Sequence, residues 1–170
     1  MNIIITGQRH VGKTTLIQEV IKELQLSYAG YCTVPDQEYE IGWSYDMVNL
    51  MTHEKMPISC FDGQCMKGIS ETFETFGVEC LKQSLNSCKD IIVLDEIGRF
   101  ERKSALFLSM IHHVLDSSYC VLAVVKAEKI DYLQNMKARK DCLLLDLDVI
   151  SYKEAKTKIL SVLNTKGEML

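Results

Sequence analysis

The sequence GQRHVGKTT runs from Gly7 to Thr15. The apolar segment Asn2–Thr6 precedes it, and the amphipathic stretch Lys13–Leu26 follows it. It matches the pattern G-x-x-x-x-G-K-[ST], and in this strand, turn and helix context the pattern predicts a loop that binds phosphate groups. The residues expected to contact the phosphates are Gly7, Gln8, Arg9, His10, Val11, Gly12, Lys13, Thr14 and Thr15.

The chemistry of this loop points to a nucleoside triphosphate as its ligand. Gly7 and Gly12 let successive backbone N–H groups point inward, and the following helix adds the positive end of its dipole. We expect the Lys13 ammonium to bridge the β- and γ-phosphates and so act in catalysis. The Thr14 hydroxyl is expected to coordinate Mg²⁺, which leaves Thr15 to bond the α-phosphate.

A second candidate group follows the apolar strand Asp90–Asp95, which ends in the acid pair Asp95-Glu96. Parallel strands share one carboxyl edge, so this pair is expected beside the phosphate loop. Asp95 is predicted to hold Mg²⁺ together with Thr14. Glu96 is predicted to orient or deprotonate an attacking water, which favours hydrolysis over transfer to another substrate.

Short apolar segments alternate with longer amphipathic ones, which is typical of buried parallel strands covered by helices. We therefore expect an α/β fold of three layers with a mostly parallel central sheet. The predicted strands are Asn2–Thr6, Ala29–Val34, Ile41–Leu50, Asp90–Asp95, Tyr119–Val125 and Cys142–Leu147. The predicted helices are Lys13–Leu26, Thr72–Ser87, Lys103–Ser117, Lys129–Arg139 and Tyr152–Thr165.

The region 29–50 departs from this alternation and predicts a small antiparallel addition to the sheet. Residues 41–48 alternate apolar and polar side chains, which is the period of a half-exposed strand. We expect this strand to pair with Tyr31–Val34 across a turn at Pro35-Asp36. Trp43 and Tyr45 could stack on a nucleobase, but their spacing is that of ordinary sheet packing, which we favour. Thr52–Ser70 is expected to be a loop or a mobile excursion.

Composition excludes several classes of protein. The 170 residues fit one domain, 1–170, and the 19 basic against 23 acidic residues give a net charge of −4. The chain has no excess of basic residues, which argues against a nucleic acid partner. No apolar run is long enough to span a membrane. We expect a nucleoside triphosphate as ligand and neither nucleic acid nor a membrane as partner; the sequence leaves the oligomeric state open, with a monomer favoured.

The cysteines indicate a reducing compartment. Seven are present, an odd number, and no two of them form a C-x-x-C pair. We expect buried, reduced thiols rather than disulfides or a zinc site, and hence a cytoplasmic protein.

Three segments together resemble the THEP1-type nucleoside triphosphatases, a family of small P-loop enzymes of the RecA-like branch. They are ITGQRHVGKTTLIQEV, then AGYCTV followed by EIGWSYDMVNL, and then IIVLDEIGRFERKSALF, within Ile3–Leu147. The most selective motif is D-E-I-G-R-F-E, residues 95–101. The resemblance implies Mg²⁺-dependent hydrolysis of several nucleoside triphosphates.

The chain departs from the family pattern at three places. Arg9 and His10 stand where Pro and Gly are usual, residues 36–41 lack the usual basic residue, and residues 146–150 lack the usual Asn-Arg step. If that arginine steadies the γ-phosphate, hydrolysis is slower or lost here, or else Arg99 or Arg102 replaces it. We expect Arg99 to act as an internal arginine finger.

Two other functions fit the same motifs. The protein could be a small-molecule or nucleoside kinase in which Thr52–Ser70 forms an acceptor pocket or lid. It could instead be a nucleotide-dependent binding protein that acts as a switch. Val125-Lys126-Ala127-Glu128 lacks the Asn/Thr and Asp of a guanine-reading motif, so guanine specificity is not expected.

Overall fold

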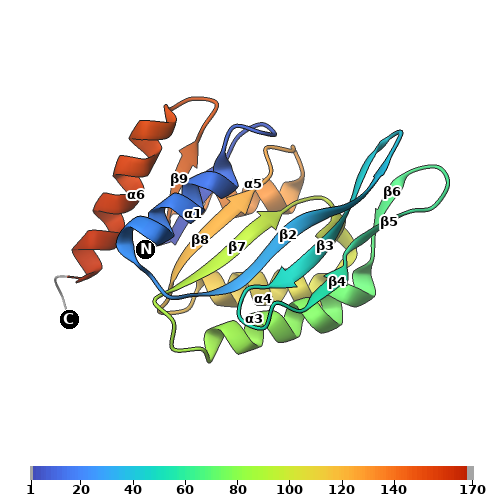
Figure 1. The fold of residues 1–170 in the computed structure, drawn as a ribbon, viewed down its shortest axis with the longest axis horizontal. Helices are drawn as coiled ribbons and strands as arrows, with labels where there is room; N and C mark the ends of the chain where they lie inside the picture. The colour runs from blue at the N-terminus through green and yellow to red at the C-terminus, as the bar shows by residue number, and fades with distance from the viewer. Residues whose placement is uncertain (1, 168–170) are drawn as a thin grey trace.

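A central sheet of seven strands organises the chain, and the computed structural model describes residues 2–167 (Figure 1). The strand order is β4-β3-β2-β7-β8-β1-β9. The strands are β1 (Asn2–Thr6), β2 (Tyr28–Tyr39), β3 (Gly42–Asn49), β4 (Lys55–Pro57), β7 (Ile91–Ile97), β8 (Cys120–Val125) and β9 (Cys142–Asp146). The five strands from β2 to β9 in this order are parallel, and β3 and β4 add on antiparallel.

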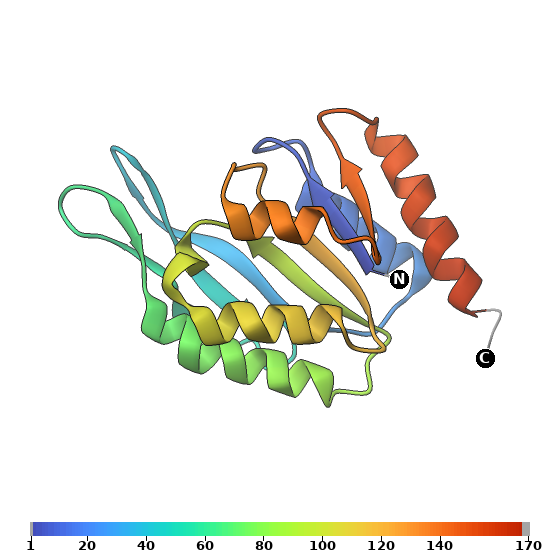
Figure 2. The ribbon, with the colours of Figure 1, turned by 180° about the vertical axis from the view of Figure 1, so that it is seen from behind.

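Helices cover both faces of the sheet (Figures 1 and 2). One face carries α1 (Lys13–Leu24) and α6 (Tyr152–Gly167). The other carries α3 (Val78–Leu85), α4 (Ala105–Leu115) and α5 (Asp131–Lys137), with the short α2 (Ser70–Thr72), η1 (Phe73–Gly77) and η2 (Phe100–Lys103) alongside. The predicted three-layer α/β fold is confirmed.

The parallel strands are apolar along their whole length because both of their faces are covered. In β1, Ile4 packs into the core beneath α3, α4 and α5, whereas Ile3 and Ile5 pack into the core beneath α1 and α6. In β7, Ile92 and Leu94 likewise face the first core. This alternation fixes which side chains at the ends of the strands point to each face.

The antiparallel addition is present, but the predicted turn at Pro35-Asp36 is wrong. β2 continues to Tyr39, and the chain reverses at residues 40–41 before Gly42, whose φ is +135°. The ladder shifts register between Pro35 and Glu38, and such an irregularity accommodates a proline that has no N–H to donate. The longer hairpin carries its turn well beyond the end of β7.

The expectation of a loop at Thr52–Ser70 is also wrong, since this region holds β4 and the hairpin of β5 (Ser59–Phe61) and β6 (Met66–Gly68). The turn between them is built on Asp62, whose carboxylate accepts hydrogen bonds from the N–H groups of Gln64 and Cys65, each 2.9 Å long. Strands of three residues are too short to show a period, although Asp62-Gly63 is itself a turn signal.

The cysteines only partly follow expectation. None of the seven, all of which lie within residues 2–167, forms a disulfide. Cys60, Cys65 and Cys88 are exposed, so the prediction of buried thiols is wrong for these three. Their segments lie in turns and short strands at the surface, where flanking residues carry no apolar period. Within residues 2–167 no helix is long and apolar enough to cross a bilayer.

Replacing Gly30 with Ala should destabilise the fold by about 3 kcal/mol or more. Gly30 in β2 has a φ of +112°, and a Cβ there would lie 1.9 Å from the carbonyl oxygen of Val93 in β7. Gly42→Ala is the control, because its φ is equally strained but its Cβ would meet nothing within 4 Å. It should cost about 1 kcal/mol. Equal midpoints of the two variants in chemical denaturation would contradict this account.

Candidate active site

The predicted phosphate loop connects the carboxyl end of β1 to the N-terminus of α1. Gly7 and Gly12 have φ values of +135° and +94°, and His10 also lies in the left-handed region at +64°. The Gln8 N–H donates to the Asp148 carboxylate at 3.1 Å, which ties the loop to the segment after β9. The loop therefore curls with a shape that the two glycines and His10 together supply.

Lys13 lies under this loop and is 7 % exposed. Its Nζ donates to the carbonyl oxygens of Gly7 at 2.9 Å and Gln8 at 2.6 Å. Burial lowers the pKa of Lys13, and the nearby carboxylates of Glu96 and Asp148 oppose that shift. The ammonium is held by neutral carbonyls alone, so an anionic ligand in the loop offers it a stronger partner.

Thr14 and Asp95 lie side by side, as the sequence predicts for a shared metal site. Asp95 in β7 and Ile5 in β1 both pair with Val124 of the intervening strand β8, so the acid is level with the start of the loop. The Thr14 hydroxyl lies beside the Asp95 carboxylate and favours its ionised form. Burial raises the pKa of Asp95 to about 6, and the neighbouring Thr14 hydroxyl opposes the shift.

These two oxygen donors fit a magnesium ion. Among residues 2–167 no group of three or more His, Cys, Asp or Glu side chains is placed to hold a metal. Mg²⁺ needs few protein ligands, because it keeps water and takes phosphate oxygens as its other ligands. A cation beside Asp95 would also favour its ionised form, which burial otherwise disfavours. The donor set thus suits Mg²⁺ bound together with a nucleotide.

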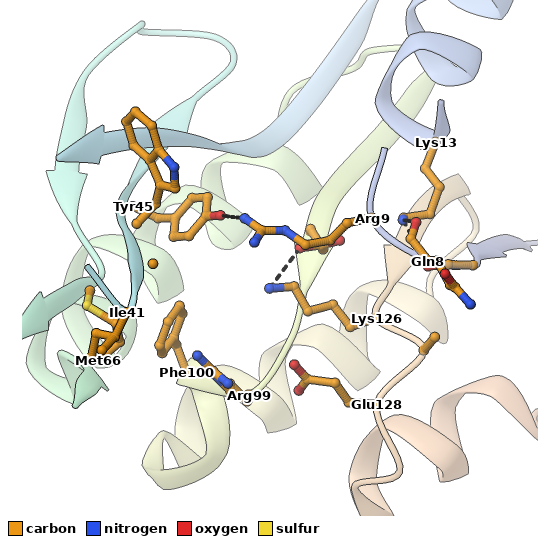
Figure 3. A pocket seen from close by; sticks show the side chains of 15 residues that line it. Gln8, Arg9, Lys13, Ile41, Tyr45, Met66, Arg99, Phe100, Lys126 and Glu128 are labelled. Atoms are coloured by element: carbon orange, nitrogen blue, oxygen red, sulfur yellow. Dashed lines mark hydrogen bonds and ion pairs between the residues drawn. The ribbon is translucent and has the colours of Figure 1, made fainter. Parts of the chain in front are cut away.

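Glu96 faces the loop and forms an ion pair that sequence reasoning missed. Its Oε1 lies 3.2 Å from Nζ of Lys126, which directly follows β8 (Figure 3). The Lys126 ammonium also lies 5.7 Å from the ring centre of Tyr45 and 5.9 Å from that of Phe100. The available signal was a lysine placed just after a buried strand, at the edge where Asp95 and Glu96 also emerge.

The three arginines named from the sequence lie at different places in the structure. Arg9 in the loop donates a hydrogen bond to the Tyr45 hydroxyl (Figure 3). Arg99 lies over the Phe100 ring, 5.3 Å from its centre, at the wall of the same cavity. Arg102 is exposed and lines a different cavity beside Lys67 and Lys103. Only Arg99 of the two candidate fingers is therefore within this site.

Two adjoining cavities open between the loop and the antiparallel addition. The larger, about 630 Å³, is lined by Thr14, Thr15 and Asp95 among others. The smaller, about 270 Å³, reaches from Lys13 to the tip of the β2–β3 hairpin. Trp43 and Tyr45 are half-buried strand residues, as expected, but they also line both cavities, so ordinary sheet packing does not describe them fully.

Glu101 supports the segment that follows β7. It is 2 % exposed, and its Oε2 accepts the Gly98 N–H at 3.1 Å. Tyr132 of α5 donates to the Gly98 carbonyl. Burial raises the pKa of Glu101 to about 7. The last acid of the D-E-I-G-R-F-E motif thus holds the chain between Glu96 and Arg99 rather than facing the cavities.

The raised pKa of Glu101 makes a prediction about stability. The Glu101 carboxyl binds its proton more tightly in the folded than in the unfolded chain, so the free energy of unfolding should fall as the pH rises from about 4.5 to about 7. Glu101→Gln keeps an acceptor for the Gly98 N–H and should reduce that fall by about 3 kcal/mol. Denaturation across this pH range measures both. Asp95, whose pKa is also raised, contributes equally to both proteins. Parallel curves of unfolding free energy against pH for the wild type and Glu101→Gln would therefore contradict the assignment.

Comparison with known proteins agrees with this geometry. Residues 2–160 match the family described as NTPase. The nucleoside-triphosphatase THEP1 of Thermotoga maritima is 29 % identical over 99 % of both chains, and that of Methanocaldococcus jannaschii is 34 % identical over 74 % of this chain and 78 % of its own.

Solved structures show the same fold. THEP1 from Aquifex aeolicus has a TM-score of 0.74 at 23 % identity and covers 96 % of this chain and 99 % of its own. A human cancer-related nucleoside triphosphatase has a TM-score of 0.71 at 21 % identity, with 96 % and 97 % covered. The family match spans nearly the whole chain, and the loop, the acid pair and the sheet order are in place: this protein belongs to the NTPase family.

Proposed function

We propose that this protein hydrolyses nucleoside triphosphates to diphosphate and phosphate, with Mg²⁺ as cofactor and with little preference for the base. The observation that carries the proposal is the contact between Thr14 and Asp95, which joins the phosphate loop to the strand β7. The names of its relatives, nucleoside-triphosphatase, support the same reaction. The protein is further proposed to act as one domain in the cytoplasm.

The loop binds the triphosphate through its backbone N–H groups and through Lys13. The Lys13 ammonium leaves the carbonyls of Gly7 and Gln8 and pairs with the β- and γ-phosphates, where it neutralises charge that develops during transfer. Thr14 and Asp95 hold Mg²⁺, which when bound neutralises phosphate charge as a Lewis acid. The side chains of Gln8, His10, Thr14 and Thr15 are exposed and can contact the ligand without unfolding the loop.

We assign Glu96 the role of orienting or deprotonating the attacking water. It lines both cavities, next to the position that Lys13 and Asp95 define for the γ-phosphate. Lys126 fixes the Glu96 carboxylate from one side, and both side chains are about three-quarters buried, at 22 % and 24 % exposed. Arg99 is free of carboxylate partners among the ion pairs of residues 2–167, so its guanidinium can turn toward the γ-phosphate.

The direct experiment is to measure phosphate release from ATP, GTP, CTP and UTP, with and without Mg²⁺. We expect release from all four at rates within about tenfold of one another, and no release with EDTA. Tight triphosphate binding with no release under any condition would contradict the proposed hydrolysis and favour a switch.

Glu96→Gln should lower kcat by about 10²-fold or more, because a positioned general base contributes that much to proton transfer. The Kd of the triphosphate should stay within a few-fold of the wild-type value, since the loop and Asp95 are unchanged. Rapid-mix phosphate assays and calorimetry give the two quantities. An unchanged kcat would remove Glu96 from this role.

Lys126→Met should lower kcat about tenfold and leave KM nearly unchanged, because Lys126 orients Glu96 through the ion pair and is assigned no contact with the nucleotide. Lys126→Arg should restore most of the rate. Lys129→Met is the matched control: this lysine is exposed on the same loop, so its loss should leave kcat unaltered. An increase in KM with an unchanged kcat for Lys126→Met would assign Lys126 to nucleotide binding instead.

A further inference from the structure

The smaller cavity would lie beyond the γ end of a triphosphate bound as proposed. Thr14 and Asp95 would hold the metal, so the β- and γ-phosphates belong beside them and the nucleoside end belongs past Thr15. All three of these residues line the larger cavity and none lines the smaller one. The two cavities share Arg9, Lys13, Trp43, Tyr45 and Glu96, so the smaller one adjoins the position proposed for the γ-phosphate between Lys13 and Glu96.

One wall of the smaller cavity is aromatic and apolar. It is built from three separate segments: the turn and start of β3, the hairpin strand β6 and the start of η2. Its members are Ile41, Trp43, Tyr45, Met66 and Phe100. Ile41 is 53 % exposed at the rim. Flat aromatic surfaces of this kind suit a ring that stacks.

The opposite wall is polar and offers an unused hydrogen-bond acceptor. Oε2 of Glu128 is buried and has no hydrogen-bond partner, and its carboxylate points into the space beside Arg99 and Lys126 (Figure 3). A buried carboxylate oxygen without a donor is costly, so a hydroxyl or amino group of a ligand is the missing partner.

The charge of the cavity favours an uncharged ligand. Apart from Lys13 and Arg9 of the phosphate loop, the cavity is lined by the cations Arg99 and Lys126 and by the carboxylates Glu96 and Glu128. These charges balance. The volume, about 270 Å³, lies just below the roughly 300 Å³ at which pockets for drug-sized molecules begin, which suits a molecule the size of a nucleoside.

From this geometry we infer that the smaller cavity is an acceptor site for a neutral nucleoside, whose base stacks on the aromatic wall and whose hydroxyl or amino groups bond Glu128. The inference rests on the proposed function, because it uses the same triphosphate site. One sugar hydroxyl takes the place of the attacking water beside Glu96. Hydrolysis is then the reaction of the enzyme when this site holds only water.

The transfer step is balanced as follows. The sugar hydroxyl oxygen forms a bond to the γ-phosphorus, and the bond from that phosphorus to the oxygen bridging to the β-phosphate breaks. The nucleoside diphosphate leaves with the electron pair of that bond. The hydroxyl proton passes to the Glu96 carboxylate and then to solvent, so the products are a nucleoside monophosphate and a nucleoside diphosphate.

Calorimetry tests the site without catalysis. The protein is saturated with Mg²⁺ and a triphosphate whose β–γ bridge is an imido group, and adenosine, guanosine, cytidine, uridine and thymidine are each titrated in. At least one is expected to bind to this loaded protein. Binding only to the nucleotide-free protein would show that the nucleoside occupies the base position of the triphosphate, and absence of binding by all five would equally overturn the inference.

Glu128→Gln should weaken that nucleoside about tenfold and leave basal phosphate release unchanged. Glu79→Gln on α3 is the matched control and should change neither quantity. With γ-labelled ATP, the label should appear on the nucleoside as well as in free phosphate. Label in free phosphate alone would overturn the acceptor role while the proposed hydrolysis stands, whereas no label released to any product would contradict the hydrolysis itself.

Discussion

The Thr14 hydroxyl lies beside the Asp95 carboxylate, and this proximity brings the phosphate loop against the end of β7. The two residues meet because β8 lies between β1 and β7, and because Ile5 and Asp95 pair with the same residue, Val124, in that strand. A shift of one register position would turn Asp95 into the opposite face and remove it from the loop. The alternating packing of β1 and β7 into two separate cores prevents such a shift.

Burying ionised groups beside the phosphate loop costs free energy in the free protein. Burial raises the pKa of Asp95 and lowers that of Lys13, so both ionised groups are poorly solvated in the free protein. A metal-bound polyphosphate, as proposed above, would supply the missing charges to each of them. Because the groups are already oriented by the sheet and the loop, little reorganisation is needed when charge develops in the reaction. Glu101 contributes in the same sense by fixing the backbone that follows Glu96.

Sequence reasoning predicted the part of the site that local motifs and the shared edge of parallel strands determine. Lys13 through Thr15 follow from one motif, and Asp95 from the end of a buried strand. It missed Lys126, because its pairing depends on which strand lies between β1 and β7. It also missed the cavity behind Glu96: the hairpin of residues 59–68 has strands too short to show a period, and the true turn of the β2–β3 hairpin lies past an irregularity at Pro35.

The proposed function requires the loop and Asp95 to share one metal-bound triphosphate. The most direct measurement is the Kd of a non-hydrolysable triphosphate with and without Mg²⁺, for wild type and for Asp95→Asn. We expect Mg²⁺ to tighten binding to the wild type about tenfold or more and to have little effect on the variant, whose affinity without Mg²⁺ stays at or above the wild-type value. An equal gain from Mg²⁺ in both proteins would contradict the claim.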